Sequence, residues 1–165
     1  WSSDVCSPDL VRNRIHDGPK MGGKSYRVPR EPVAPGTEVA DVDMKIIEAM
    51  PVKSLITFPE TGLRHRLNEA LRVRGHAWAG DRMVQRIQVS TDFGQHWQVM
   101  SLAAPRNPGA WQSFKGSVSF KQPGYHEVWA RATDEKGRSQ PMVLPGWNPK
   151  GYLNNACHRI AVHVV

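Results

Sequence analysis

The chain has 165 residues, enough for one domain of ordinary size with an irregular arm, and its 39% hydrophobic residues allow a single core. Its 13 prolines and 14 glycines leave few long segments free of both, which argues against a helical bundle and favours a mostly β chain. The formal charge of +7 favours an anionic partner, but the charge is dispersed and no nucleic-acid-binding motif accompanies it. No stretch approaches the ~18 apolar residues of a transmembrane helix. We therefore expect neither nucleic acid nor a membrane as a partner.

The first 43 residues predict an irregular N-terminal region in two parts. Residues 1–15 begin with Trp rather than Met and contain SSDVCSPDL, which resembles translated sequencing-adapter read-through. Two interpretations stay open for this part: it is non-native, or it is the end of a preceding domain. Residues 16–43 predict an extended arm or linker, because prolines block a long helix at Pro19, Pro29, Pro32 and Pro35. The chain is thus expected to be a fragment of a longer protein.

Residues 44–102 predict short strands separated by turns. Residues 44–50 form a short strand or a turn of helix, which Pro51 ends. Four strands are then expected, over residues 52–58, 71–78, 84–91 and 97–102. The dipeptide Gly80-Asp81 and the tripeptide Asp92-Phe93-Gly94 supply turns between them. In the second strand, arginines alternate with Leu71 and Val73, which indicates a solvated basic face.

The second half of the chain continues this pattern. Strands are expected over residues 111–120, 125–133, 142–144 and 158–165, with Trp111 anchoring the core. In the last strand Ile160, Val162 and Val164 share one face, the period of a half-buried strand. About seven strands with polar turns between them are typical of an immunoglobulin-like sandwich. The predicted fold class is therefore all-β: an immunoglobulin-like β-sandwich of about seven strands with an extended N-terminal arm.

Four motifs stand in order along residues 40–165: the hairpin STDFGQHW, the strand and turn WARATDEKG, the step Gln140-Pro141, and the loop WNPKGYLNNACHR. Together they resemble the C-terminal dimerisation domain of sulfite-oxidase-type molybdopterin oxidoreductases. The segment HDGPKMGGKSYRVP resembles the part of that family's chain that leaves the catalytic domain and enters the dimerisation domain. The resemblance implies a dimerisation domain over residues 44–165.

The same resemblance implies a homodimeric parent enzyme that oxidises sulfite to sulfate at a molybdopterin-bound molybdenum centre. The catalytic domain, which ligates molybdenum through a cysteine thiolate, is not in this sequence, and neither Cys6 nor Cys157 matches that ligand. We therefore expect the fragment to hold no cofactor alone, to carry no catalytic residue and to be inactive, with the missing domain as its partner in cis. The resemblance to bacterial relatives also implies a periplasmic location and an electron acceptor such as a cytochrome c.

The loop that begins at Trp147 carries the candidate site residues. In animal members of the family, an arginine of this loop helps to line the anionic sulfite pocket, and Lys150 stands at its place. Lysine keeps the positive charge but lacks the planar fork that binds an oxyanion through two hydrogen bonds. Lys150 is therefore predicted to bind substrate, and an exposed loop lysine is the alternative. Trp147, Asn148, Gly151 and Tyr152 are expected to position the loop.

Two further lysines and the seven histidines are candidates for other sites. Lys20 and Lys24 flank a glycine pair, and the backbone amides of such a turn with two ammonium groups can hold an anion near the cofactor; a flexible turn is the alternative. The seven histidines show no HExxH or other ligand spacing, so we expect no protein-ligated metal.

Two other functions stay open. The basic chain is compatible with a free-standing immunoglobulin-like binding module for an acidic partner. The corresponding domain of a nitrate reductase is similar to that of a sulfite oxidase. The incomplete N-terminus favours part of an enzyme, and the end of the chain directly after its last strand favours sulfite chemistry over nitrate chemistry.

Overall fold

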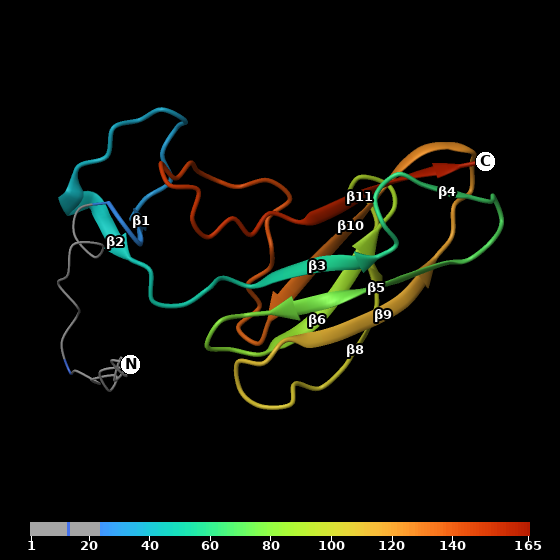
Figure 1. Ribbon diagram of the computed structural model, residues 1–165, viewed down its shortest axis with the longest axis horizontal. Helices are drawn as coiled ribbons and strands as arrows, with labels where there is room; N and C mark the ends of the chain where they lie inside the picture. Colours follow the sequence, from blue (N-terminus) through green and yellow to red (C-terminus); the bar gives the residue numbers. More distant parts are fainter. Residues whose placement is uncertain (1–12, 14–23) are drawn as a thin grey trace, which may run out of the picture.

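The computed structural model describes residue 13 and residues 24–165, and it confirms the predicted all-β class (Figure 1). The elements in chain order are β1 (Arg27–Pro29), the 3-10 turn η1 (Asp41–Asp43), β2 (Met44–Ile46), β3 (Lys53–Phe58), β4 (Leu63–His65), β5 (Leu71–Trp78), β6 (Val84–Ser90), β7 (Gln98–Val99), β8 (Ser101–Leu102), β9 (Gln112–Val118), β10 (Gly124–Asp134) and β11 (His158–Val164). Within this described part of the chain, no helix is long and apolar enough to cross a membrane.

Two sheets form the sandwich. The five-stranded sheet has the order β4-β11-β10-β6-β7, and the four-stranded sheet has the order β3-β5-β9-β8. All neighbours are antiparallel except β11 and β4, which run parallel. Figure 1 shows β1, β2 and the segment between them at one end of the sandwich, beside the loop that leads into β11.

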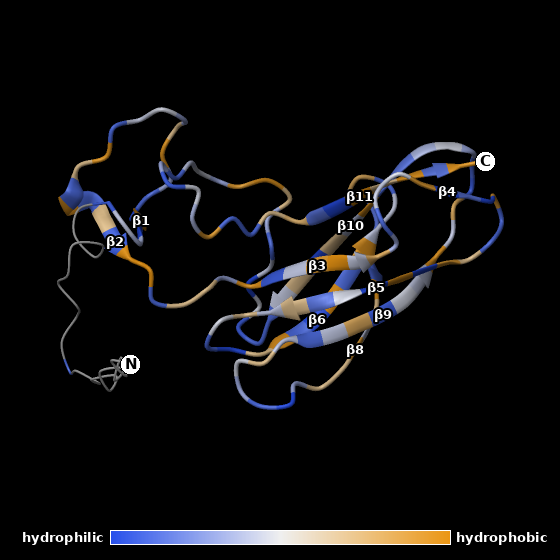
Figure 2. Cartoon of the chain, in the orientation of Figure 1, coloured by the Kyte–Doolittle hydropathy of each residue, from blue (hydrophilic) through white to orange (hydrophobic). Residues whose placement is uncertain are grey.

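The core lies between the two sheets and follows the alternation of each strand. In β11, Ile160, Val162 and Val164 are at most 5% exposed, which confirms the predicted inward face. Figure 2 shows β11 hydrophilic at its start and mostly hydrophobic further along. In β5, buried Leu71 and Val73 alternate with exposed arginines, again as predicted. The two sheets therefore enclose an apolar interior built from residues between Val52 and Val164.

Two glycines allow large side chains into this core. Gly75 and Phe114 are direct partners between β5 and β9, and a Cβ added at Gly75 would meet the Phe114 ring and the Leu55 carbonyl oxygen. A Cβ at Gly116 would meet the sulfur of buried Met100. The absence of a side chain at both positions therefore makes room for Phe114 and Met100.

Two predicted strands were wrong in part. Residues 142–144 form a loop, since the prolines Pro141 and Pro145 lack the N–H groups that a sheet ladder needs. Residues 97–102 are not one strand but two: β7 pairs with β6 in one sheet, and β8 pairs with β9 in the other. Buried Met100 stands between them, so this segment crosses from one sheet to the other.

Trp111 does not anchor the core, contrary to prediction. Its side chain is 65% exposed, and it stacks on Trp78 with ring centroids 5.1 Å apart. Side chains of a strand alternate between its two faces. Gln112 and Phe114 of β9 point into the core, so Trp111, directly before Gln112, points outward. Trp111 thus covers the outer side of Trp78 instead of filling the interior.

Candidate functional site

The loop between β10 and β11 lies against the segment between β1 and β2 and against Tyr26, the residue before β1. The Trp147 amide donates to the Val33 carbonyl at 2.9 Å, and Tyr152 stacks on Tyr26 with ring centroids 5.8 Å apart and planes 9° apart. A Cβ added at Gly146 would meet Pro32 at 2.8 Å. The two segments enclose a surface hollow of about 620 Å³. Contacts with the N-terminal segment therefore fix the base of this loop.

Lys150 stands at the exposed turn of the loop. The Gly151 amide donates to the Asn148 carbonyl at 2.9 Å, and the Lys150 amide donates to Asn148 Oδ1 at 3.0 Å. Gly151 has φ 68°, a conformation that favours glycine. Asn148 Nδ2 also donates to the Tyr152 carbonyl at 3.3 Å. The Lys150 ammonium makes no hydrogen bond or ion pair with the residues described, so it is available to an anion outside the chain.

Gln140 fixes the other end of the loop, a role that the sequence analysis missed. Its side chain is buried, with Oε1 accepting from Ser54 Oγ at 2.6 Å and from the Ala132 amide at 2.8 Å. Its Nε2 donates to the carbonyls of Asn155 and Ala156, both at 3.1 Å. The amide therefore uses its whole bonding capacity to join β3, β10 and the loop. The only sequence signal was a polar residue beside Pro141 after a strand.

Further bonds attach the end of the loop to β3. The Lys53 ammonium donates to the Asn154 carbonyl, and Asn155 Nδ2 donates to the Val52 carbonyl at 3.4 Å. The Cys157 amide donates to the Pro141 carbonyl at 2.9 Å. Both ends of the loop are thus bound to the sandwich.

His158, the first residue of β11, forms a bond between the two sheets. Its Nδ1 accepts the amide proton of Ile56 in β3 at 3.1 Å, so the ring is neutral in this arrangement. Burial, and then the positive charge of Lys53, lower the pKa of His158 below its ordinary value of 6.5. Protonation at Nδ1 would remove the acceptor.

The lysine pair predicted near a cofactor is only half described. Lys20 lies outside the described residues. Lys24 is half-buried in a turn directly before β1. Its predicted role stays a prediction.

Residues 44–165 match the family model of the Mo-co oxidoreductase dimerisation domain. The chain belongs to this family. It is 38% identical over 126 residues to human mitochondrial sulfite oxidase, covering 72% of this chain and 23% of that protein. It is 31% identical over 148 residues to mitochondrial sulfite oxidase of Drosophila melanogaster, covering 80% of this chain and 26% of that protein. The chain thus spans about a quarter of these relatives, and the family expected from the sequence motifs is confirmed.

Two other relatives widen the family. Inducible nitrate reductase [NADH] 2 of Glycine max is 34% identical over 100 residues, covering 56% of this chain and 11% of that protein. The crystal structure of the sulfane dehydrogenase SoxCD from Paracoccus pantotrophus has a TM-score of 0.61 and 25% identity, covering 83% of this chain and 34% of that chain. Members of the family therefore occur in enzymes named for different substrates.

The donor groups of this domain do not fit the ligation of molybdenum. A ligating cysteine must be a thiolate. Cys157 is 7% exposed, its thiol donates to the Gln140 carbonyl at 3.8 Å, and burial raises the pKa of that thiol. Among the residues described, no three His, Cys, Asp or Glu side chains are grouped to hold a metal ion. A buried, protonated thiol of this kind does not suit a molybdenum ligand.

Replacing Gln140 tests the anchor of the loop. In Gln140→Met, a side chain of similar size leaves Ser54 Oγ, the Ala132 amide and two carbonyls without this partner. We expect the free energy of unfolding in urea to fall by about 2–4 kcal/mol, with faster hydrogen exchange at residues 154–156. Gln98→Met is the control, because the exposed side chain of Gln98 donates only to the Ser117 carbonyl among the residues described, at 3.1 Å. Equal stability of Gln140→Met and the wild type would contradict the assigned role.

Changing the pH tests the His158 bond. Folding lowers the pKa of His158, so as the pH falls the unfolded chain binds a proton at this residue before the folded chain does. The free energy of unfolding therefore decreases as the pH drops below about 6.5. The asparagine of His158→Asn can accept the Ile56 amide proton without titrating, so its unfolding midpoint should fall less between pH 7 and pH 5. Asp92 does not interfere, because its pKa of about 2 confines its effect to lower pH. His163→Asn, on the exposed face of β11, is the control; the same pH dependence in all three proteins would refute the idea.

Proposed function

We propose that this chain is the dimerisation domain of a molybdenum-dependent sulfite oxidase or dehydrogenase, where it contributes to a homodimer interface and to one side of the anionic substrate pocket. Family membership supports the enzyme class. The observation that carries the substrate part is the exposed ammonium of Lys150, which has no partner among the residues described and stands on a loop bound at both ends. Such a loop fixes the backbone that carries the charge, so less backbone entropy is lost when an anion binds.

Sulfite suits this position because it carries negative charge on three oxygens. An ammonium binds such an anion as a point charge and donates up to three hydrogen bonds, without the fixed geometry of a guanidinium. The oxidation adds an oxygen from water to sulfite and releases two electrons and two protons. The molybdopterin-bound molybdenum that supplies this chemistry would be held by another part of the parent enzyme, and the poor fit of Cys157 supports this. A periplasmic location and a cytochrome c acceptor belong to the proposal through the family resemblance.

Sulfite is favoured over nitrate as the substrate of the parent enzyme. The sulfite oxidases align with 72% and 80% of this chain, whereas the nitrate reductase aligns with 56%. The third possibility is a binding module for an acidic partner. It is supported by the basic outer face of the four-stranded sheet, where Arg72, Arg74 and Lys115 are exposed.

Substitution of Lys150 in the full-length enzyme tests the substrate pocket. Lys150→Ala should raise the KM for sulfite about 10- to 100-fold with little change in kcat, because one charge-assisted contact is lost from the bound state. Lys150→Arg should retain most of the affinity. The matched control is Lys136→Ala, an exposed turn lysine between β10 and the loop. A KM unchanged in Lys150→Ala would remove this residue from the pocket.

Sedimentation of the isolated chain tests self-association. An isologous contact makes the dimer fraction depend on concentration. We expect the weight-average sedimentation coefficient to rise from a monomer value to a dimer value as concentration increases from micromolar to several hundred micromolar. A strict monomer over that range would count against the dimer interface and leave the Lys150 proposal standing.

A further inference from the structure

The four-stranded sheet carries positive charge without any acidic residue. None of its strands, β3, β5, β8 and β9, contains Asp or Glu. Arg72, Arg74 and Lys115 are exposed on its outer face. In contrast, β10 of the five-stranded sheet contains Glu127 and Asp134. The +7 charge of the chain is thus locally unbalanced on one face.

The charges on this face are close together and unpaired. Arg74 and Lys115 are direct partners in the register of β5 and β9, and Arg72 lies opposite Ser117. The Arg74 guanidinium lies 5.0 Å from the centre of the Phe58 ring. None of the three cations forms a salt bridge to a described carboxylate. Like charges directly opposite each other destabilise a sheet, so binding of an anionic group would reduce the repulsion between these cations.

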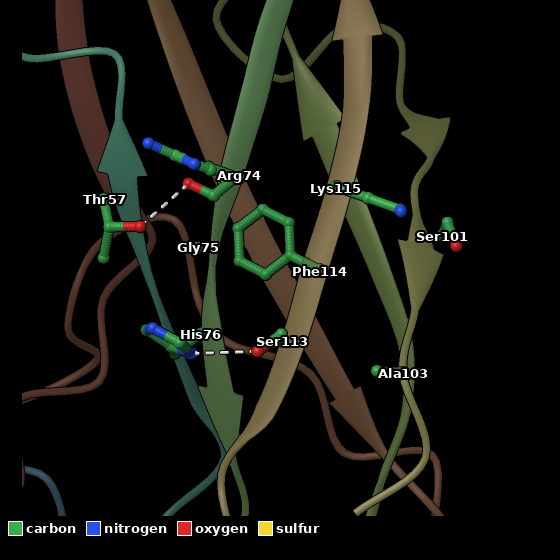
Figure 3. A pocket seen from close by; sticks show the side chains of 9 residues that line it. All are labelled: Thr57, Arg74, Gly75, His76, Ser101, Ala103, Ser113, Phe114 and Lys115. Atoms are coloured by element: carbon green, nitrogen blue, oxygen red, sulfur yellow. Dashed lines mark hydrogen bonds between the residues drawn. The ribbon is translucent and has the colours of Figure 1, made fainter.

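The same cations line a groove. Two hollows of about 600 and 640 Å³ lie along the sheet and share Arg74, Ser101 and Lys115. Figure 3 shows lining side chains that come from all four strands, among them the hydroxyl groups of Thr57 and Ser113. These hydroxyls can donate to or accept from a polar ligand. The groove therefore combines positive charge with neutral hydrogen-bonding groups.

We propose that this groove binds an extended acidic segment of a partner protein. Arg72 and Arg74 are alternate residues of one strand, so their Cα atoms are about 6.8 Å apart, the spacing of alternate residues in any extended chain. A segment with a carboxylate at every second position matches that repeat. The cations follow the strands and do not converge on one point, which favours a segment over a single ion.

A second copy of the same face is a poorer occupant. A two-fold contact would bring Arg74 and Lys115 of each copy towards the same positive face of the other, with no carboxylate from these strands to offset the repulsion. The groove and the Lys150 loop also belong to different elements, so the inference goes beyond the proposed function and does not depend on it.

Calorimetric titration of the chain with an unlabelled heptapeptide in which glutamate alternates with serine tests the groove. We expect saturable binding that weakens as salt rises from 20 to 150 mM, and no binding of the glutamine analogue. The double variant Arg74→Ser, Lys115→Ser should bind at least about 10-fold more weakly. The control double variant Arg64→Ser, Arg86→Ser removes the same charge from exposed positions of the five-stranded sheet and should bind like the wild type.

Four outcomes would overturn the proposal. One is the absence of peptide binding by the wild type. A second is an equal loss of affinity in both double variants, which would mean unspecific attraction. A third is displacement of the peptide by inorganic phosphate at micromolar concentration, which would make the groove a small-anion site. The fourth is an altered sedimentation profile of the Arg74→Ser, Lys115→Ser variant with unchanged peptide binding, which would assign the face to self-association. Matching circular dichroism of all variants verifies their fold.

Discussion

The buried amide of Gln140 joins parts of the molecule that are far apart along the chain. Ser54, which bonds its oxygen, is 86 residues away and lies in the opposite sheet. Its nitrogen holds two carbonyls of the loop that leads into β11. Hydrogen bonds in a buried site are strong, and a missing partner there is costly, so only one arrangement satisfies all of them. The sandwich and the loop therefore form one structural unit, and the position of Lys150 follows from it.

The two sheets share one core but present different outer faces. On the five-stranded sheet, Glu127 accepts from Tyr125 and Trp129 and lies 4.0 Å from Arg159, so a carboxylate offsets part of the positive charge of that sheet. On the four-stranded sheet, the Arg74 guanidinium lies over the Phe58 ring and pairs with no carboxylate in the part of the chain that the structure describes. Because the core fixes both sheets, this asymmetry of charge is a permanent property of the domain. The two faces are thus suited to different partners.

The alternation of buried and exposed residues along single strands could be predicted from the sequence, because successive side chains of a strand point to opposite faces. The inward faces of β5 and β11 are examples. Features of the fold that depend on contacts between residues far apart in the sequence could not be predicted. Residues 97–102 have strand-forming composition throughout, yet Met100 turns the chain from one sheet to the other. The environment of Lys150 likewise depends on Val33 and Tyr26, which lie more than a hundred residues earlier. The residues of the loop itself do not indicate that Val33 and Tyr26 contact it.

The loop has a fixed backbone, but its Lys150 ammonium has no partner among the residues described. This combination limits how well the loop can distinguish one anion from another. Gln140 and the Tyr26–Tyr152 stack hold the backbone, while the Lys150 side chain keeps its rotamers. An ammonium on a flexible stem accepts oxyanions of several shapes, whereas a guanidinium fork favours planar, bidentate ones. A pocket that relies on Lys150 therefore gains attraction for anions but little discrimination among them. Under the proposed function, discrimination between oxyanions would therefore come from groups outside this loop.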